Sequence, residues 1–199
     1  NEAFAAVRDV LTALPVDFDH DGDLDLVVSA EAGISLWLNR DNSTFVESTQ
    51  HSIVPPADAR IHSLIAVDWD RNVSIDVLAF GERSAGLLKN VLHGQLLWEP
   101  FPADSGLSNG VRSAALLDAD ANFSWDLLTT ATGDENDPAA TVSWNPTKNP
   151  DAGVVRFTGQ SQLPSPTASS ITTCDYDNDG FQDAMTWRGD TITFLRGGP

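Results

Sequence analysis

The chain has 199 residues, of which 41% are hydrophobic, so it can bury a core and is not expected to be disordered. Its 29 acidic residues against 11 basic ones give a net charge of −18, which excludes a nucleic-acid surface because phosphates require clustered lysine and arginine. A single cysteine excludes an internal disulfide, and no apolar run reaches the ~20 residues that span a bilayer, so we expect no membrane insertion.

Four segments of the chain align without gaps, and each carries an aspartate-rich stretch between two apolar runs. Successive segments begin 51, 50 and 57 residues apart, a pitch typical of the blades of a β-propeller. The segments are VDFDHDGDLDLVV (16–28), VDWDRNVSIDVLA (67–79), LDADANFSWDLLT (117–129) and CDYDNDGFQDAMT (174–186).

The predicted strands follow the same order in each repeat. One apolar run precedes the aspartates, a β-rich run follows them, and third and fourth runs come after turns rich in glycine or polar residues. The third runs are 34–38, 86–88, 141–144 and 191–194, and the fourth runs are 44–46, 96–98 and 154–157.

This pattern predicts an all-β protein: a β-propeller or propeller segment of four four-stranded blades, each of about 50 residues. The aspartate-rich loops would lie between the first and second strands of each blade. Residues 1–9 are expected to supply a strand that completes the last blade or a preceding one. The predicted repeats cover residues 10–50, 60–102, 110–158 and 167–199.

The first and fourth loops, residues 17–25 and 175–183, carry carboxylates at positions 1, 3, 5 and 9 of a nine-residue stretch. Glycine at position 6 permits the sharp turn that directs these side chains and the carbonyl of position 7 toward one small volume. Hard oxygen ligands in this number suit Ca²⁺, which takes about 6–8 of them in flexible geometry. The predicted calcium ligands are Asp17, Asp19, Asp21, Asp23 and Asp25 in loop one and Asp175, Asp177, Asp179, Phe181 and Asp183 in loop four, with Asp23 and Phe181 acting through backbone carbonyls.

The second and third loops keep aspartate at positions 1, 3 and 9 but have asparagine at position 5 and no glycine at position 6. Val73 and Phe123 stand at position 6, where a left-handed backbone is strained for a side chain, most of all for a β-branched one. Two interpretations stay open: weaker calcium sites, or turns whose aspartates bind only backbone N–H groups. The candidate ligands are Asp68, Asp70, Asn72, Ser74 and Asp76 in loop two and Asp118, Asp120, Asn122, Ser124 and Asp126 in loop three.

Other metal motifs fit these loops less well. A helical EF-hand shares the early aspartate spacing but requires glutamate at position 12 and flanking helices. Position 12 is Val28 in loop one and Thr186 in loop four, and both flanks have the pattern of strands. Zinc or copper would require cysteine or a suitably spaced histidine pair, which the loops lack. Calcium is therefore the cofactor that the sequence predicts.

These loops resemble FG-GAP/VCBS repeats, whose signature is DxDxDGxxD between two strands. The match is specific at Asp17–Asp25 and Asp175–Asp183 and partial in the middle pair, and residues 36–45 (LWLNRDNSTF) are similar to a strand-turn-strand of cartilage-acidic-protein-like (ASPIC/UnbV-type) members. The resemblance implies an integrin-α-type propeller that is extracellular, engaged in adhesion or ligand binding, and tied to no fixed catalytic chemistry.

The sequence predicts a binding module rather than an enzyme. It has no nucleophile elbow, no phosphate-binding glycine loop and no histidine pair for a metal, and its conspicuous carboxylate pairs recur at the repeat period. We expect a secreted or cell-surface protein whose targeting signal lies outside this chain and whose partner is a protein or a carbohydrate. The alternatives are an accessory propeller domain of a larger secreted enzyme, and pairing with further blades or a second chain to complete a ring.

Two positions carry further structural expectations. Cys174 aligns with the apolar strand residues Val16, Val67 and Leu117, so we expect it to be buried. Gly189 and Asp190 are expected to form a two-residue hairpin turn.

Overall fold

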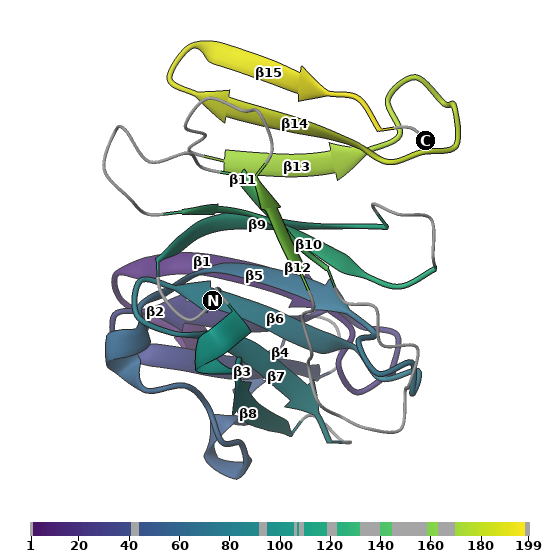
Figure 1. Cartoon of the computed structure of the whole chain (residues 1–199). Coiled ribbons are helices and arrows are strands. Elements are labelled where there is room, and N and C mark those ends of the chain that lie inside the picture. Colours follow the sequence, from purple (N-terminus) through teal and green to yellow (C-terminus); the bar gives the residue numbers. More distant parts are fainter. Residues whose placement is uncertain are drawn as a thin grey trace. The chain divides into compact units, whose positions relative to one another are not determined.

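The computed structural model describes residues 2–40, 44–91, 95–105, 107, 110–118, 123–131, 140–144, 159–162 and 170–197. These residues form four antiparallel β-sheets, which confirms the predicted all-β class (Figure 1). The chain divides into two compact units, Asn1–Pro102 and Ala103–Pro199, each of which holds two sheets. The helices among the described residues are short 3₁₀ turns, and none of them is long and apolar enough to cross a membrane.

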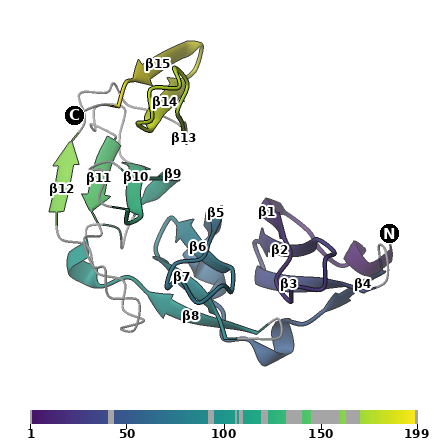
Figure 2. The same ribbon diagram turned by 90° about the vertical axis from the view of Figure 1, so that its right-hand side faces the viewer.

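The first unit contains two four-stranded sheets in which neighbours in sequence are neighbours in the sheet. The first strands of the two sheets, β1 and β5, lie side by side (Figure 2). The strands are β1 (Val10–Val16), β2 (Asp25–Ala30), β3 (Gly33–Arg40) and β4 (Thr44–Glu47), then β5 (Ile61–Val67), β6 (Asp76–Gly81), β7 (Ala85–Asn90) and β8 (Leu96–Pro100).

The second unit repeats this order with one sheet of four strands and one of three. Here β9 and β13 are the neighbouring strands of the two sheets. The predicted fourth strand at 154–157 lies outside the described residues. The strands are β9 (Val111–Leu117), β10 (Asp126–Ala131), β11 (Ala140–Trp144) and β12 (Gly159–Gln162), then β13 (Ser170–Cys174), β14 (Asp183–Arg188) and β15 (Thr191–Leu195).

In the first unit, the second strand of each sheet is its most buried strand. Every residue of β6 is buried, because the strand lies between β5 and β7 and has covered faces on both sides. The edge strand β4 differs, because it has no buried residue. The β14–β15 hairpin pairs Arg188 with Thr191, so Gly189 and Asp190 form the predicted two-residue turn.

One core joins the two sheets of the first unit. It combines buried residues of the first sheet, such as Phe18 and Leu36, with Val77 and Leu88 of the second. Asn90 strengthens this junction because its Nδ2 donates a hydrogen bond to the carbonyl of Phe18 at 3.0 Å. The first and second repeats therefore share one core, as expected for stacked repeats.

The N-terminal segment is not the strand that the sequence predicted. Glu2–Phe4 forms a 3₁₀ turn, and no strand begins before Val10. The ring of Phe4 packs on Trp37 and Phe45, with centroids 4.9 and 5.1 Å away. Burial of this ring, rather than pairing of backbone, determines where the segment lies. Asp9 then takes a left-handed φ of 51°, which interrupts extended backbone just before β1.

The fourth sheet exposes apolar side chains at positions that the first sheet buries. In the first repeat these positions belong to the core shared with the second sheet. Within the described part of the chain, no sheet covers the equivalent face of the fourth. The paired exposures are 1% for Phe18 and 53% for Tyr176, 5% for Ile34 and 59% for Ile192, and 0% for Leu36 and 58% for Phe194.

The same difference corrects the expectation for Cys174. Its counterparts Val16, Val67 and Leu117 are buried, but Cys174 is exposed. The residue does end a strand, β13, as the alignment requires. Its exposure follows from the uncovered face of the fourth sheet and not from a different local structure.

Candidate metal centres

Each aspartate-rich loop connects the first and second strands of its sheet, and position 9 is the first residue of the second strand. In loops one, two and four, two left-handed residues curl the loop and turn the side chains of positions 1 and 3 inward. Val73 holds this conformation with a φ of 78°, as the sequence predicted, at a cost in strain. The left-handed residues are His20, Arg71 and Asn178 at position 4 and Gly22, Val73, Phe123 and Gly180 at position 6.

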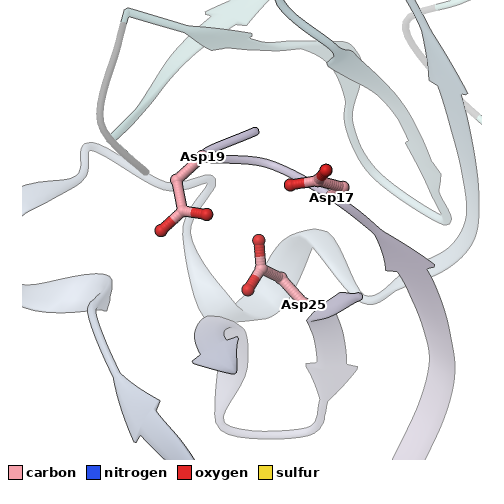
Figure 3. Close-up of side chains that lie close together, drawn as sticks. All are labelled: Asp17, Asp19 and Asp25. Atoms are coloured by element: carbon pink, nitrogen blue, oxygen red, sulfur yellow. The ribbon is translucent and has the colours of Figure 1, made fainter. Parts of the chain in front are cut away.

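The carboxylates of positions 1, 3 and 9 converge. In loop one, Asp17, Asp19 and Asp25 each offer an oxygen, and these oxygens lie within 4.8 Å of one another (Figure 3). Two oxygens on opposite sides of a calcium ion, each at about 2.3–2.6 Å, would have a similar separation. The same grouping recurs at Asp68, Asp70 and Asp76 in loop two and at Asp175, Asp177 and Asp183 in loop four.

Loop three is described only in part. Asp118, Ser124 and Asp126 lie among the described residues, whereas the predicted ligands Asp120 and Asn122 lie outside them. Asp118 Oδ2 accepts a hydrogen bond from Phe123 N–H at 2.8 Å, as its counterparts do in the other loops.

The aspartate at position 9 also closes the base of its loop. Asp25 is fully buried; its Oδ2 accepts Phe18 N–H and its Oδ1 accepts Asn39 N–H, both at 2.8 Å. The second donor lies on the third strand, 14 residues further along the chain. This pair of hydrogen bonds, here called the clamp, therefore ties the loop to the second and third strands of its sheet without a metal. It recurs at Asp76, which binds Trp69 and Asn90, and at Asp183, which binds Tyr176 and Gly197.

Burial shifts the pKa of two of the position-9 aspartates, Asp25 and Asp76. Loss of hydration raises the pKa of Asp76 to about 6, with the nearby carboxylate of Asp70 adding to the shift, while the backbone hydrogen bond from Asn90 opposes it. The pKa of Asp25 is raised for the same first reason. A neighbouring cation would lower the pKa of such a carboxyl group, because it favours the ionised form.

Positions 1 and 5 shape the loop through backbone hydrogen bonds. Asp17 Oδ2 accepts Gly22 N–H at 3.1 Å, and Asp21 Oδ1 accepts Asp23 N–H at 3.0 Å. Backbone hydrogen bonds to the aspartates were one of the two interpretations of loops two and three. Loop one, which has the complete set of candidate ligands, makes the same bonds, so these bonds do not exclude a metal. The equivalent pairs are Asp68 with Asn72 and Val73, Asn72 with Ser74, Asp175 with Asp179 and Gly180, and Asp179 with Phe181.

Several loop oxygens are buried without a donor. Oδ1 of Asp17, Asp19 and Asp70 accepts no hydrogen bond from the described residues. The side chains of Asp19 and Asp70 are only 10% exposed. A buried carboxylate oxygen that lacks a partner is costly, and a cation among the three carboxylates would satisfy it. The donor set, all oxygen and highly charged, fits calcium.

A basic side chain reaches each described cluster from the end of the third strand. Arg40 lies 2.8 Å from Asp19, Lys89 lies 2.9 Å from Asp70, and Arg196 lies 2.8 Å from Asp177. The sequence analysis missed these residues, as it missed the clamps. A basic residue 13 to 15 positions after the position-9 aspartate is the signal that would have found them.

Comparison with known proteins identifies the repeat. The FG-GAP-like repeat family matches residues 17–79, which span loops one and two. These residues form an FG-GAP-like repeat. The resemblance to FG-GAP repeats that the sequence indicated is confirmed for these residues. A search of curated proteins finds no match.

A solved structure is similar to the chain as a whole. It is a lectin from Agrocybe aegerita, described for its specific recognition of non-reducing terminal N-acetylglucosamine. The TM-score is 0.60 at 17% identity, over 94% of this chain and 50% of the lectin chain. This chain therefore spans half the length of that lectin, and the likeness concerns the fold alone.

Proposed function

We propose that the chain is a calcium-binding β-propeller module of FG-GAP-like repeats that acts outside the cell by binding a protein or carbohydrate ligand and catalyses no reaction. The observation that carries the proposal is the convergence of three carboxylates in each described cluster, with oxygens within 4.8 Å of one another; in loop one, two of these aspartates also have a buried oxygen without a donor among the described residues. Like charges held this close repel one another, so the loops require a cation to be stable.

Calcium has a structural role in this account. Asp17, Asp19, Asp21 and Asp25, with the carbonyl of Asp23, would hold one ion, and the equivalent residues of loop four would hold another. Each ion would fix the connection between the first two strands of its sheet and offset part of the charge of −18. Ligands would then bind to loops at one end of the sheets.

The resemblance to ASPIC/UnbV-type members and the fold of the lectin support a ligand-binding role over a catalytic one. A carbohydrate is one of the two ligand classes proposed, because the matched lectin recognises one. The alternative, an accessory domain of a larger secreted enzyme, would keep the same calcium sites and add catalysis from elsewhere.

Thermal unfolding tests the calcium proposal. Adding calcium to protein stripped with a chelator is expected to raise the melting temperature, because calcium at 100 times its dissociation constant stabilises the folded chain by about 2.7 kcal/mol per site. Magnesium at the same concentration is the control and should have little effect, since it prefers octahedral sites that keep water. Equal melting temperatures in chelator and in calcium would refute the proposal.

Assembly is a second candidate function, favoured by the exposed apolar face of the fourth sheet. Tyr176, Trp187, Ile192 and Phe194 are each between 37% and 59% exposed. Soluble monomers rarely expose contiguous apolar surface without a use for it. Because the first sheet buries the equivalent face against another sheet, we assign a second copy of this chain as the occupant, packed through its own fourth sheet.

Light scattering tests this assembly. The chain is expected to have twice the mass of a single copy, and the double substitution Ile192→Asp, Phe194→Asp should give single copies. Val46→Asp, at an apolar residue of β4 that is 52% exposed, is the matched control and should not change the mass. Single copies of the unsubstituted chain at high concentration would contradict the assembly.

A further inference from the structure

Loop two contains a cation of its own. The ammonium of Lys89, near the end of β7, lies 2.9 Å from Asp70 Oδ2. The Lys89 side chain is 22% exposed and that of Asp70 is 10% exposed, so water screens this pair little. The lysine therefore sits against the acidic cluster formed by Asp68, Asp70 and Asp76.

The basic residues of the other loops are placed differently. Arg40 is 49% exposed and Arg196 is 63% exposed, each beside two carboxylates at the outer side of its loop. Exposed ion pairs of this kind contribute about 0–1 kcal/mol and separate readily. A metal ion entering loop one or loop four would displace only a solvated guanidinium, whereas in loop two it would have to expel a largely buried ammonium.

The residue at position 5 also makes loop two a poorer metal site than loops one and four. Asn72 has one side-chain oxygen, and it accepts Ser74 N–H at 2.7 Å. Asp21 and Asp179 use one carboxylate oxygen for the equivalent bond and have a second one, which faces Arg40 in loop one and Arg196 in loop four and would become a metal ligand when that exposed arginine moves away. Loop two thus has fewer oxygens and less negative charge to offer a metal than loops one and four.

Lys89 remains charged in this position. A lysine side chain ordinarily carries its charge at neutral pH, and here the ammonium forms an ion pair with Asp70. Its charge offsets the mutual repulsion of the cluster, which is the role that calcium would have in the other loops.

We propose that Lys89 is the resident cation of loop two, so that this loop excludes calcium and keeps its shape without it. This inference rests on the proposed function, because it distinguishes loop two from loops that bind calcium. In this proposal, the side chain of Lys89 on the third strand is the reason that loop two does not depend on a metal, whereas loops one and four do.

The test is a calcium titration of variants by calorimetry. The double substitution Asn72→Asp, Lys89→Met supplies the missing oxygen and removes the ammonium, and it is expected to bind one more calcium ion than the unsubstituted chain. Asn72→Asp alone is the matched control and should bind no more. Lys89→Met alone should lower the melting temperature in chelator, because nothing then offsets the repulsion among Asp68, Asp70 and Asp76.

Terbium luminescence locates the added ion. Trp69 is at position 2 of loop two, so terbium bound there should be sensitised by this indole, and Trp69→Phe in the double variant should abolish the added signal. A double variant that binds no additional ion, or an added ion already present in Asn72→Asp, would overturn the inference. If the unsubstituted chain itself binds no calcium, the proposed function fails instead, and retained binding at loops one and four verifies that each variant is folded.

Discussion

Replacing Asp25 with alanine is expected to lower the free energy of unfolding by about 3 kcal/mol, even when calcium is absent. The carboxylate is fully buried and accepts two backbone N–H groups, one from Phe18 and one from Asn39. Truncation leaves both donors without an acceptor. Burial raises the pKa of Asp25, so the buried negative charge is itself unfavourable. The loss in free energy of unfolding therefore comes mainly from the two N–H groups that lose their acceptor.

Urea unfolding in chelator measures this effect. Asp23→Ala is the matched control: it removes the same charge from the same loop, but the Asp23 side chain is only partly buried, so a change within about 0.5 kcal/mol is expected. Equal losses for the two substitutions would show that the position-9 aspartate is not a structural clamp.

Asp19→Ala and Asp177→Ala are each expected to remove one calcium ion and with it about 2.7 kcal/mol of stabilisation at calcium concentrations 100 times the dissociation constant. Position 3 contributes no backbone clamp in loop one, and Asp19 Oδ1 has no donor among the described residues, so its role is that of a ligand. In chelator, each substitution should be nearly neutral, because it relieves repulsion within the cluster.

Asp70→Ala is the comparison that ranks the loops. It removes the same residue type from loop two, where Lys89 already neutralises the cluster, and it should leave the amount of bound calcium unchanged. A larger loss of calcium from Asp70→Ala than from Asp19→Ala or Asp177→Ala would reverse the ranking of the loops.

The metal clusters are predictable from sequence because their ligands are local. Positions 1, 3 and 9 lie on one curled loop, and residue type alone indicates their chemistry. The clamps are different: their donors are backbone N–H groups of Asn39, Asn90 and Gly197, so the side chain at this position does not make the bond. Any non-proline residue supplies such a donor, so the sequence carries no signal for it.

Expectations that failed depend on packing between elements rather than on local pattern. Cys174 aligns with apolar strand residues of the other repeats, but its burial depends on whether another sheet covers it. Residues 1–9 look like a short strand, yet Phe4 finds apolar surface on Trp37 and Phe45 instead. Lys89 and Arg196 lie 13 positions after the position-9 aspartate and Arg40 lies 15 after it, so their contact with the cluster depends on the pairing of the second and third strands and not on the loop itself.

The most direct test of the account is the amount of calcium that the purified, chelator-stripped chain binds at equilibrium dialysis, measured beside the variant that carries both Asp19→Ala and Asp177→Ala. The account predicts that the unsubstituted chain binds two more calcium ions than this variant, one in loop one and one in loop four. Equal amounts of bound calcium in the two proteins would contradict it.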